Sequence, residues 1–343
     1  MQTNNKLKYL IMRFLSIPQS GLSWQQPLVY SFTTEGDEPE DVRIVIRDLQ
    51  SGEPIATKML YGVTVAQVDI APYLRSVYQE SIVAPEATGV MVSTTSRYVG
   101  VDVGGVVSSP SLFLAAPLNV EQPEMLSMLA DVQDVEYGDL IYFTLFTPQR
   151  TKLVIASHTP LTARRQQFTG PEVAQPLDVI IHTARLAPNI KKIVVDIYNG
   201  EGQYRTLTFN IVASDSRSRR LFWRNARGGV ESYSFPRSIR LATQATIDKF
   251  ATGKESYYAR LKSSTECYRL CSAYESANEL ERIAEIIRSP YVYEMMGGQL
   301  RPVELRSRSV EYGAHGELRQ LLLEVETGWD GASQTDGKEV LHG

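Results

Sequence analysis

The sequence has few residues that could cross-link the chain or hold a metal ion. It contains two cysteines and four histidines in 343 residues. Cys267 and Cys271 are four residues apart, so a disulfide between them would close no long loop. A metal site would need two further thiol or imidazole ligands. No ligand spacing is found among His158, His182, His315 and His342. We therefore predict packing thiols, no disulfide scaffold, no metal and no cofactor.

Charge of one sign and long apolar runs are also scarce. The 35 Lys and Arg residues nearly balance 39 Asp and Glu residues, giving a net charge of −4. This balance does not favour general attraction to nucleic acid or to a membrane surface. Nowhere do about 18 uncharged apolar residues follow one another, so no membrane span is expected. The apolar run at residues 6–15 is interrupted by Arg13 and lacks a cleavage site, which favours a first β-strand and folding in a cytoplasm.

Local catalytic motifs are absent as well. The sequence has no nucleophile elbow, no paired catalytic carboxylates and no metal-binding histidine pair, so no catalytic residues are predicted. The glycine pair in residues 101–107 lacks the spacing of a dinucleotide site. Residues 35–41 hold many carboxylates without the spacing of a calcium loop, which favours a solvated hairpin connection. The enzyme alternative is an unclassified hydrolase whose site is assembled from distant residues.

The sequence is rich in short β-type runs separated by turn residues. Val42, Ile44 and Ile46 alternate with polar residues, a period typical of half-buried strands. Further strands are expected at 28–33, 55–60, 65–70, 89–93, 98–103, 140–146, 151–156, 177–182, 192–198 and 205–211. We predict a mainly β protein with two β-sandwich-like (Ig-like) domains and a smaller α+β module. The expected bounds are 1–117, 118–235 and 236–329, followed by a flexible tail at 330–343.

Two helices are expected. Pro72 can open a short helix that runs through Tyr78. Ser276 and Glu279 fit a capping box at the start of the second helix, which should end at Ser289. Apolar residues then follow at helical spacing, namely Leu280, Ile283, Ala284 and Ile287.

Basic residues are concentrated between residues 215 and 260, a segment that contains ten Lys and Arg residues but four Asp and Glu residues. Guanidinium groups bind carboxylates well, so Arg219, Arg220 and Arg227 are candidates for contact with an acidic neighbouring subunit. The alternative is solvent-facing charge around a strand and its loop. Nucleic acid is not the expected partner, because no pattern of interleaved basic and aromatic residues accompanies the charge.

Residues 221–235 predict an aromatic hairpin. Phe222 and Trp223 can end one strand, and the turn that follows contains Asn225, Gly228 and Gly229. Tyr233 then lies on the returning strand. We predict a structural role for Trp223, Asn225, Gly228, Gly229 and Tyr233. For Trp223, a place in the chain's own core is an equal alternative to an intersubunit contact.

This Trp-x-Asn-x-x-Gly-Gly turn resembles a segment in structural proteins of tailed phages and prophages that infect Bacteroidetes. The order of segments 286–293, 300–305 and 321–325 also resembles those proteins, and the resemblance covers residues 203–329. It implies a noncatalytic tail, tail-tip or baseplate-like subunit that binds copies of itself and other virion proteins, in a virion assembled in the host cytoplasm. The binding-class alternative is a glycan-binding or adhesion module, suggested by the tyrosines on β-sandwiches.

Overall fold

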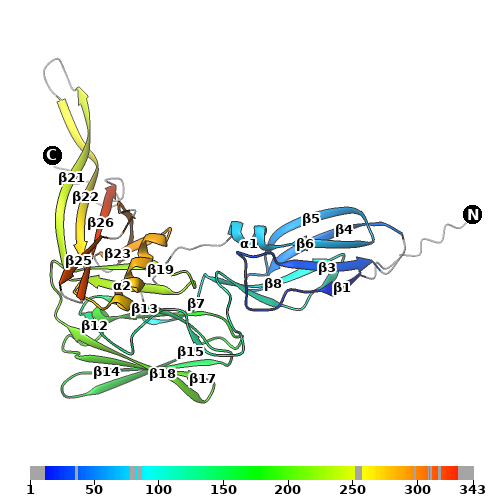
Figure 1. Cartoon of the computed structure of the whole chain (residues 1–343), viewed down its shortest axis with the longest axis horizontal. Helices are drawn as coiled ribbons and strands as arrows, with labels where there is room; N and C mark the ends of the chain where they lie inside the picture. The colour runs from blue at the N-terminus through cyan, green and yellow to red at the C-terminus, as the bar shows by residue number, and fades with distance from the viewer. Residues whose placement is uncertain are drawn as a thin grey trace, which may run out of the picture.

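Strands account for most of the computed structural model (Figure 1). It describes residues 12–34, 38–77, 82–83, 87–251, 257–296, 299–307, 309, 311–315 and 318–330. The predicted mainly β class is confirmed at this level. Helical segments in the described residues are α1 (Ala71–Val77), α2 (Ala277–Ala284), and the 3-10 turns η1 (Thr183–Arg185) and η2 (Glu285–Arg288). None of these combines the length and the apolarity needed to cross a bilayer.

Two sheets pack around one core in the N-terminal region. One sheet has the order β1-β3-β6, and the other has the order β2-β10-β8-β4-β5 with β9 on β8. Val42, Ile44 and Ile46 of β4 all face the core, as their alternation predicts. The strands are β1 (Met12–Ser16), β2 (Leu22–Ser23), β3 (Val29–Thr34), β4 (Glu40–Asp48), β5 (Pro54–Val63), β6 (Val65–Asp69), β8 (Ser96–Val103), β9 (Val106–Val107) and β10 (Ser111–Leu114).

The next strand, β7 (Gly89–Val92), forms where the sequence predicts one, but its partner lies in a different region. It pairs antiparallel with β16 (Leu177–His182), from Val92 opposite Leu177 to Gly89 opposite Ile180. The chain then returns to the N-terminal region through β8. Hydrogen bonding therefore ties the two regions together before the first is complete.

The middle region is a second pair of sheets with a shared core. Their orders are β11-β13-β16-β7 and β12-β18-β17-β14-β15. Phe143 of β13 stacks on Phe209 of β18, with ring centroids 6.5 Å apart. The remaining strands are β11 (Glu124–Met125), β12 (Val132–Glu136), β13 (Leu140–Phe146), β14 (Thr151–His158), β15 (Ala163–Thr169), β17 (Lys192–Asn199) and β18 (Gly202–Val212).

The C-terminal region is one long sheet with the order β20-β19-β23-β24-β26-β22-β21, and β25 pairs with β26. The second expected helix is confirmed as α2, whose N-cap Ser276 accepts a hydrogen bond from the Glu279 amide. Leu280 and Ile283 of this helix pack against the sheet. The strands are β19 (Arg219–Arg224), β20 (Val230–Phe235), β21 (Arg237–Ala251), β22 (Tyr257–Cys271), β23 (Val292–Met296), β24 (Gln299–Leu305), β25 (Glu311–His315) and β26 (Leu318–Asp330).

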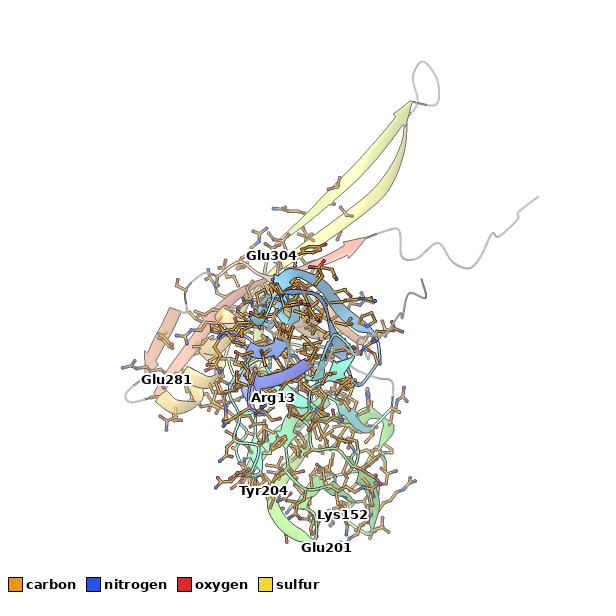
Figure 2. All side chains as sticks on the ribbon, turned by 90° about the vertical axis from the view of Figure 1, so that its right-hand side faces the viewer. Arg13, Lys152, Glu201, Tyr204, Glu281 and Glu304 are labelled. Carbon is orange, nitrogen blue, oxygen red and sulfur yellow. The ribbon has the colours of Figure 1, made fainter. Side chains whose placement is uncertain are left out.

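Strands β21 and β22, which together we call the arm, project from the body of the molecule (Figure 1). Within the described residues, strand β26 pairs with β22 up to Ser263 and Asp330. Beyond that pair the described part of the arm consists of two strands, which pair as far as Ala251 and Tyr257. Figure 2 shows Lys152, Glu201 and Tyr204 at the end of the body opposite the arm.

Some expectations concern residues outside those that the structure describes. They are the strand at 6–11, the first part of the acidic loop at 35–37, the end of the first helix at Tyr78, and the tail at 331–343. Cys267 and Cys271 are described, and both are buried and free on β22.

Candidate functional site

The five residues predicted to build the aromatic hairpin lie in β19, β20 and the turn between them. The Asn225 side-chain oxygen accepts hydrogen bonds from the amides of Arg227 and Gly229, at 3.0 and 2.9 Å. Gly228 has a φ of +82°, a conformation that favours glycine. The Asn225 side chain and the Gly228 backbone thus shape the turn.

Gly229 and Trp223 are held against other parts of the chain. A Cβ atom on Gly229 would lie 2.4 Å from the carbonyl carbon and oxygen of Leu126. Only a glycine allows so close an approach of two backbones. Trp223 is buried in the core of the C-terminal region beside Leu221 and Phe235, so its side chain serves the fold of this chain.

A buried carboxylate joins the hairpin to the middle region and to α2. Glu231 accepts hydrogen bonds from the Met128 amide at 2.6 Å, from the Asn225 side chain at 2.7 Å and from Arg282 at 2.9 Å. Burial raises the pKa of the Glu231 carboxyl, and the nearby Arg282 guanidinium opposes this rise. Three separate segments therefore meet at one side chain.

A second buried ion pair lies on the other side of the turn. The Arg224 guanidinium is 3.4 Å from the Asp178 carboxylate of β16 and donates to the Gly228 carbonyl at 3.0 Å. It also donates to the Thr94 hydroxyl, which precedes β8. The Thr144 hydroxyl donates to Asp178 at 2.7 Å. The hairpin is thus a junction that connects all three regions through hydrogen-bonded charges.

The three candidate interface arginines all have partners inside the chain. Arg219 pairs with Glu294, and Arg220 donates to the hydroxyls of Ser232 and Ser234 at 2.8 and 2.7 Å. Arg220 is buried, so its guanidinium presents almost no surface to a neighbouring subunit.

The third arginine, Arg227, pairs with Glu124 and keeps 40% of its side chain exposed. Of the three, it is the most exposed. Tyr233 donates its hydroxyl hydrogen to Glu275 at 2.9 Å and accepts from the Ala273 amide. Its pKa is raised, mainly by burial.

The described side chains of β21 in the arm are mostly exposed to solvent, whereas those of the hairpin β19–β20 are mostly buried. On β21, Ile239 is 41% exposed, Leu241 43% and Ile247 50%. Strand β21 ends the sheet, and over residues 239–247 the structure shows backbone hydrogen bonds to β22 alone. This outer edge is therefore open along the described part of the arm.

The opposite edge of the same sheet is closed by side chains. The Ser127 hydroxyl donates to the carbonyl of Val230 on β20, and the amide of Val230 donates to Thr144. Arg282 donates to the carbonyl of Ser232. Unpaired strand edges recruit other strands, and such side-chain contacts prevent this at β20. The sequence pattern predicts the hairpin at residues 221–235 but does not predict the open edge of β21.

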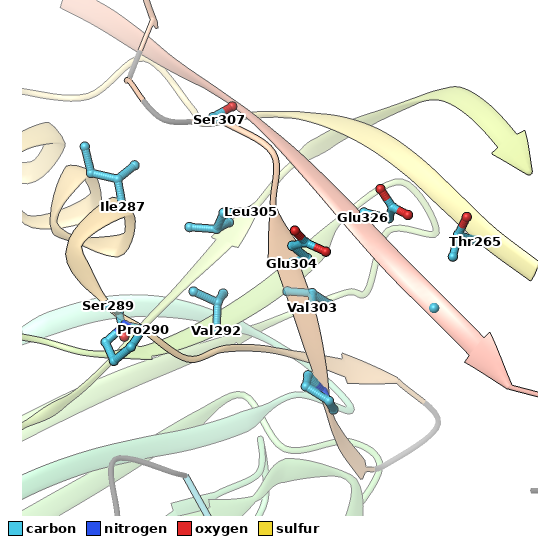
Figure 3. Close-up of a pocket in the computed structure, with 12 residues that line it drawn as sticks. Thr265, Ile287, Ser289, Pro290, Val292, Val303, Glu304, Leu305, Ser307 and Glu326 are labelled. Atoms are coloured by element: carbon cyan, nitrogen blue, oxygen red, sulfur yellow. The ribbon is translucent and has the colours of Figure 1, made fainter.

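Two open grooves of about 680 Å³ each flank the C-terminal sheet. The first lies between η2 and strands β24 and β26, where Ile287, Val303 and Leu305 form an apolar lining beside Glu304 and Glu326 (Figure 3). It contains no histidine or cysteine.

The second groove lies between β12 and the pair formed by β20 and α2. Its lining includes the carboxylates of Asp134, Glu136, Glu275 and Glu279. Within the described ranges, no three His, Cys, Asp or Glu side chains form a cluster that could hold a metal ion.

Comparisons with known proteins give no family for this chain. No family description matches it, and no curated protein is significantly similar. A crystal structure of CBD12 from CALX1.2 has 7% identity and a TM-score of 0.19, over 54% of this chain and 78% of that one. The chicken CNTN1 FN1-FN3 domains have 10% identity and a TM-score of 0.20, over 76% and 91%.

A bacterial ice-binding adhesin of 1.5 MDa, described for its retention on the host cell surface, has 7% identity and a TM-score of 0.16, over 77% of this chain and 93% of that one. TM-scores this low do not indicate a shared overall fold. The function proposed below therefore rests on the chain's own residues.

Proposed function

We propose that the chain is a noncatalytic structural subunit of a phage tail or tail-like particle, and that it acts by forming interfaces with copies of itself and with other virion proteins. The observation that carries this proposal is the arm. Beyond the pair Ser263 and Asp330, the part of the arm that the structure describes consists of two strands. An isolated two-stranded ribbon is at best marginally stable in water, so the outer arm gains stability when a neighbour covers it.

The dimensions and the surface of the arm suit such a contact. Strand β21 has 15 residues, which span about 50 Å in an extended strand. Its outer edge can add a strand from a neighbour through backbone hydrogen bonds. Ile239 and Leu241 are exposed near the base of the arm, where a β-bulge at Leu241 interrupts the strand alternation, and both offer apolar area to a neighbour.

The buried junction supports the same function. A subunit that joins a symmetric particle needs its contact surface in a defined direction relative to its body. The arm follows β20 after a single residue, Pro236, and β20 is anchored through Glu231 to α2 and to the middle region. The base of the arm is thus held by a hydrogen-bonded core.

The phage setting rests on the resemblance of residues 203–329 to tail proteins. The hairpin and the strands that carry the resemblance belong to the same sheet as the arm. The Trp-x-Asn-x-x-Gly-Gly turn carries the resemblance to those proteins. In this chain the same turn contacts all three regions. In this proposal the buried hairpin is the base of the arm, and the arm makes the contact.

Removing the outer arm tests the proposal. In the shortened variant, an Asn-Gly turn replaces residues 246–263, because Asn-Gly favours a two-residue hairpin turn. We expect the full chain to form rings or tube sections that light scattering and negative-stain imaging detect, and the shortened chain to stay monomeric with a similar melting temperature.

The control substitution is Leu161→Asn in the exposed turn between β14 and β15, which should assemble as the parent does. Equal particle masses for the full and the shortened chains would contradict the role of the arm. A full chain that remains monomeric at its highest soluble concentration would contradict homomeric assembly. Binding on a glycan array by such a monomer would favour the adhesion alternative.

A further inference from the structure

We infer that the arm of one copy docks along the outer edge of β12 in a second copy, in the groove between β12 and α2. This inference rests on the proposed function and names the surface that receives the arm. It joins two unlike surfaces, since the arm and the groove are different parts of the chain. Such a head-to-tail contact closes into a ring or continues as a helical tube.

The outer edge of β12 has unused backbone groups. The carbonyl of Asp131 accepts a hydrogen bond from Thr208 of β18. Because successive residues of a strand alternate in direction, Val132 and Asp134 direct their amides and carbonyls away from β18. In the described part of the chain these backbone groups have no hydrogen-bond partner. The edge can therefore accept an added strand.

The charges of the groove and the arm are opposite. Four carboxylates line the groove, and one of them, Glu279, pairs with Arg282, which also contacts Glu231. The other arginine of the groove, Arg220, lies beside Asp139. Among the described residues, Asp134, Glu136 and Glu275 have no salt bridge, so the groove keeps an excess of negative charge. Between residues 237 and 262 the sequence has six Lys and Arg against two Asp and Glu. Complementary charge favours this pairing and fixes its register.

The arm that fills the groove comes from another copy. Pro236 lines the groove, and β21 begins at the next residue. From there the arm projects away from β12 (Figure 1). A chain cannot place its own outer arm in a groove at the base of that arm. The site is thus completed only by a second molecule.

The experiment combines charge-reversal variants with a proline substitution that prevents strand pairing at the edge of β12. The variants are Asp134→Lys in the groove, Lys249→Glu in the arm and the double variant with both changes. Val132→Pro removes an outward amide, and proline is tolerated on edge strands. Matched controls are Glu201→Lys and Arg165→Glu, which reverse exposed charges on β-hairpins of the middle region.

The measurement is the dissociation constant of assembly, from sedimentation or light scattering, with circular dichroism to confirm folding. We expect each single variant to weaken assembly by about tenfold or more, the double variant to recover to within about threefold of the parent, and the controls to be unchanged.

Two outcomes separate this inference from the proposed function. If the shortened arm abolishes assembly while Asp134→Lys and Val132→Pro assemble normally, the arm binds elsewhere and the β12 site is wrong. If the shortened chain still assembles, both the docking site and the role of the arm are wrong. Failure of the double reversal to recover any assembly would also overturn the site.

Discussion

Two consecutive hairpins of the C-terminal sheet, β19–β20 and β21–β22, have opposite environments. The first is short and buried, and its turn lies against the backbone of Leu126. The second is more than twice as long, and its side chains from 239 to 247 are exposed. The two are separated by Pro236 alone, yet β20 and β21 form the two ends of one sheet.

The two edge strands of this sheet differ in whether side chains cover their free backbone groups. Side chains from the middle region and from α2 cover the backbone of β20, so no further strand can add there. Strand β21 has no such cover along its described residues. Proteins avoid long open edges unless a partner uses them. The first hairpin therefore serves the fold of one chain, and in the proposed function the second serves contacts between chains.

The largest expected effect is on the buried hairpin. Replacing Glu231 by alanine leaves Arg282, the Asn225 side chain and the Met128 amide without their shared acceptor. Breaking a buried ion pair from one side costs about 3–5 kcal/mol of unfolding free energy. Urea unfolding should show this loss.

The matched variant Glu201→Ala removes an exposed carboxylate, and it should change stability by less than about 0.5 kcal/mol. Equal midpoints for Glu231→Ala and Glu201→Ala would show that the first hairpin is not the junction described above.

The second effect concerns the close approach at the turn. Gly229→Ala places a methyl group 2.4 Å from the Leu126 backbone, which cannot move without disturbing β13. Overpacking of this kind costs about 1–3 kcal/mol. In the control Gly202→Ala, the nearest atom lies 3.7 Å from the added carbon. A thermal melt in which both variants match the parent would contradict this close packing.

The sequence predicts the local features of the first hairpin, because they depend on nearby residues. Asn225 and Gly228 have side-chain and backbone preferences that specify a turn, and the aromatic residues around them favour strands. The burial of Arg220 could not be predicted in this way. It depends on Asp139, which is far away in the sequence.

The same limit explains two other differences. The short β-type run at residues 89–93 predicts a strand but not its partner β16, because pairing depends on topology rather than on local composition. The arm was not predicted as a pair of long strands. Ile239 and Leu241 alternate, but the residues after them are mostly Thr, Ala and Gln, which form no apolar stripe. A strand without a buried face gives a weak periodic signal.

Leu241→Ser separates the roles of the two hairpins. This side chain is 43% exposed, so we expect a change in unfolding free energy of less than about 0.5 kcal/mol. Loss of apolar contact at an interface should weaken assembly by about tenfold, which corresponds to about 1.4 kcal/mol. Analytical ultracentrifugation measures the assembly and urea unfolding the stability. A loss of stability without a loss of assembly would reverse the roles assigned to the two hairpins.

The smallest expected effect is a pH dependence that belongs to the buried hairpin. Burial raises the pKa of Glu294, the partner of Arg219, above its ordinary value. The folded chain therefore binds more protons than the unfolded chain between the ordinary and the raised pKa. The stabilising contribution is complete below the ordinary pKa and is lost as the pH rises through the raised one.

Glu294→Gln removes this titration. The unfolding free energy of this variant should therefore decline less with rising pH than that of the parent, whereas Leu241→Ser on the arm should keep the parent's slope. Urea unfolding at a series of pH values tests this, and parallel curves for Glu294→Gln and the parent would contradict it.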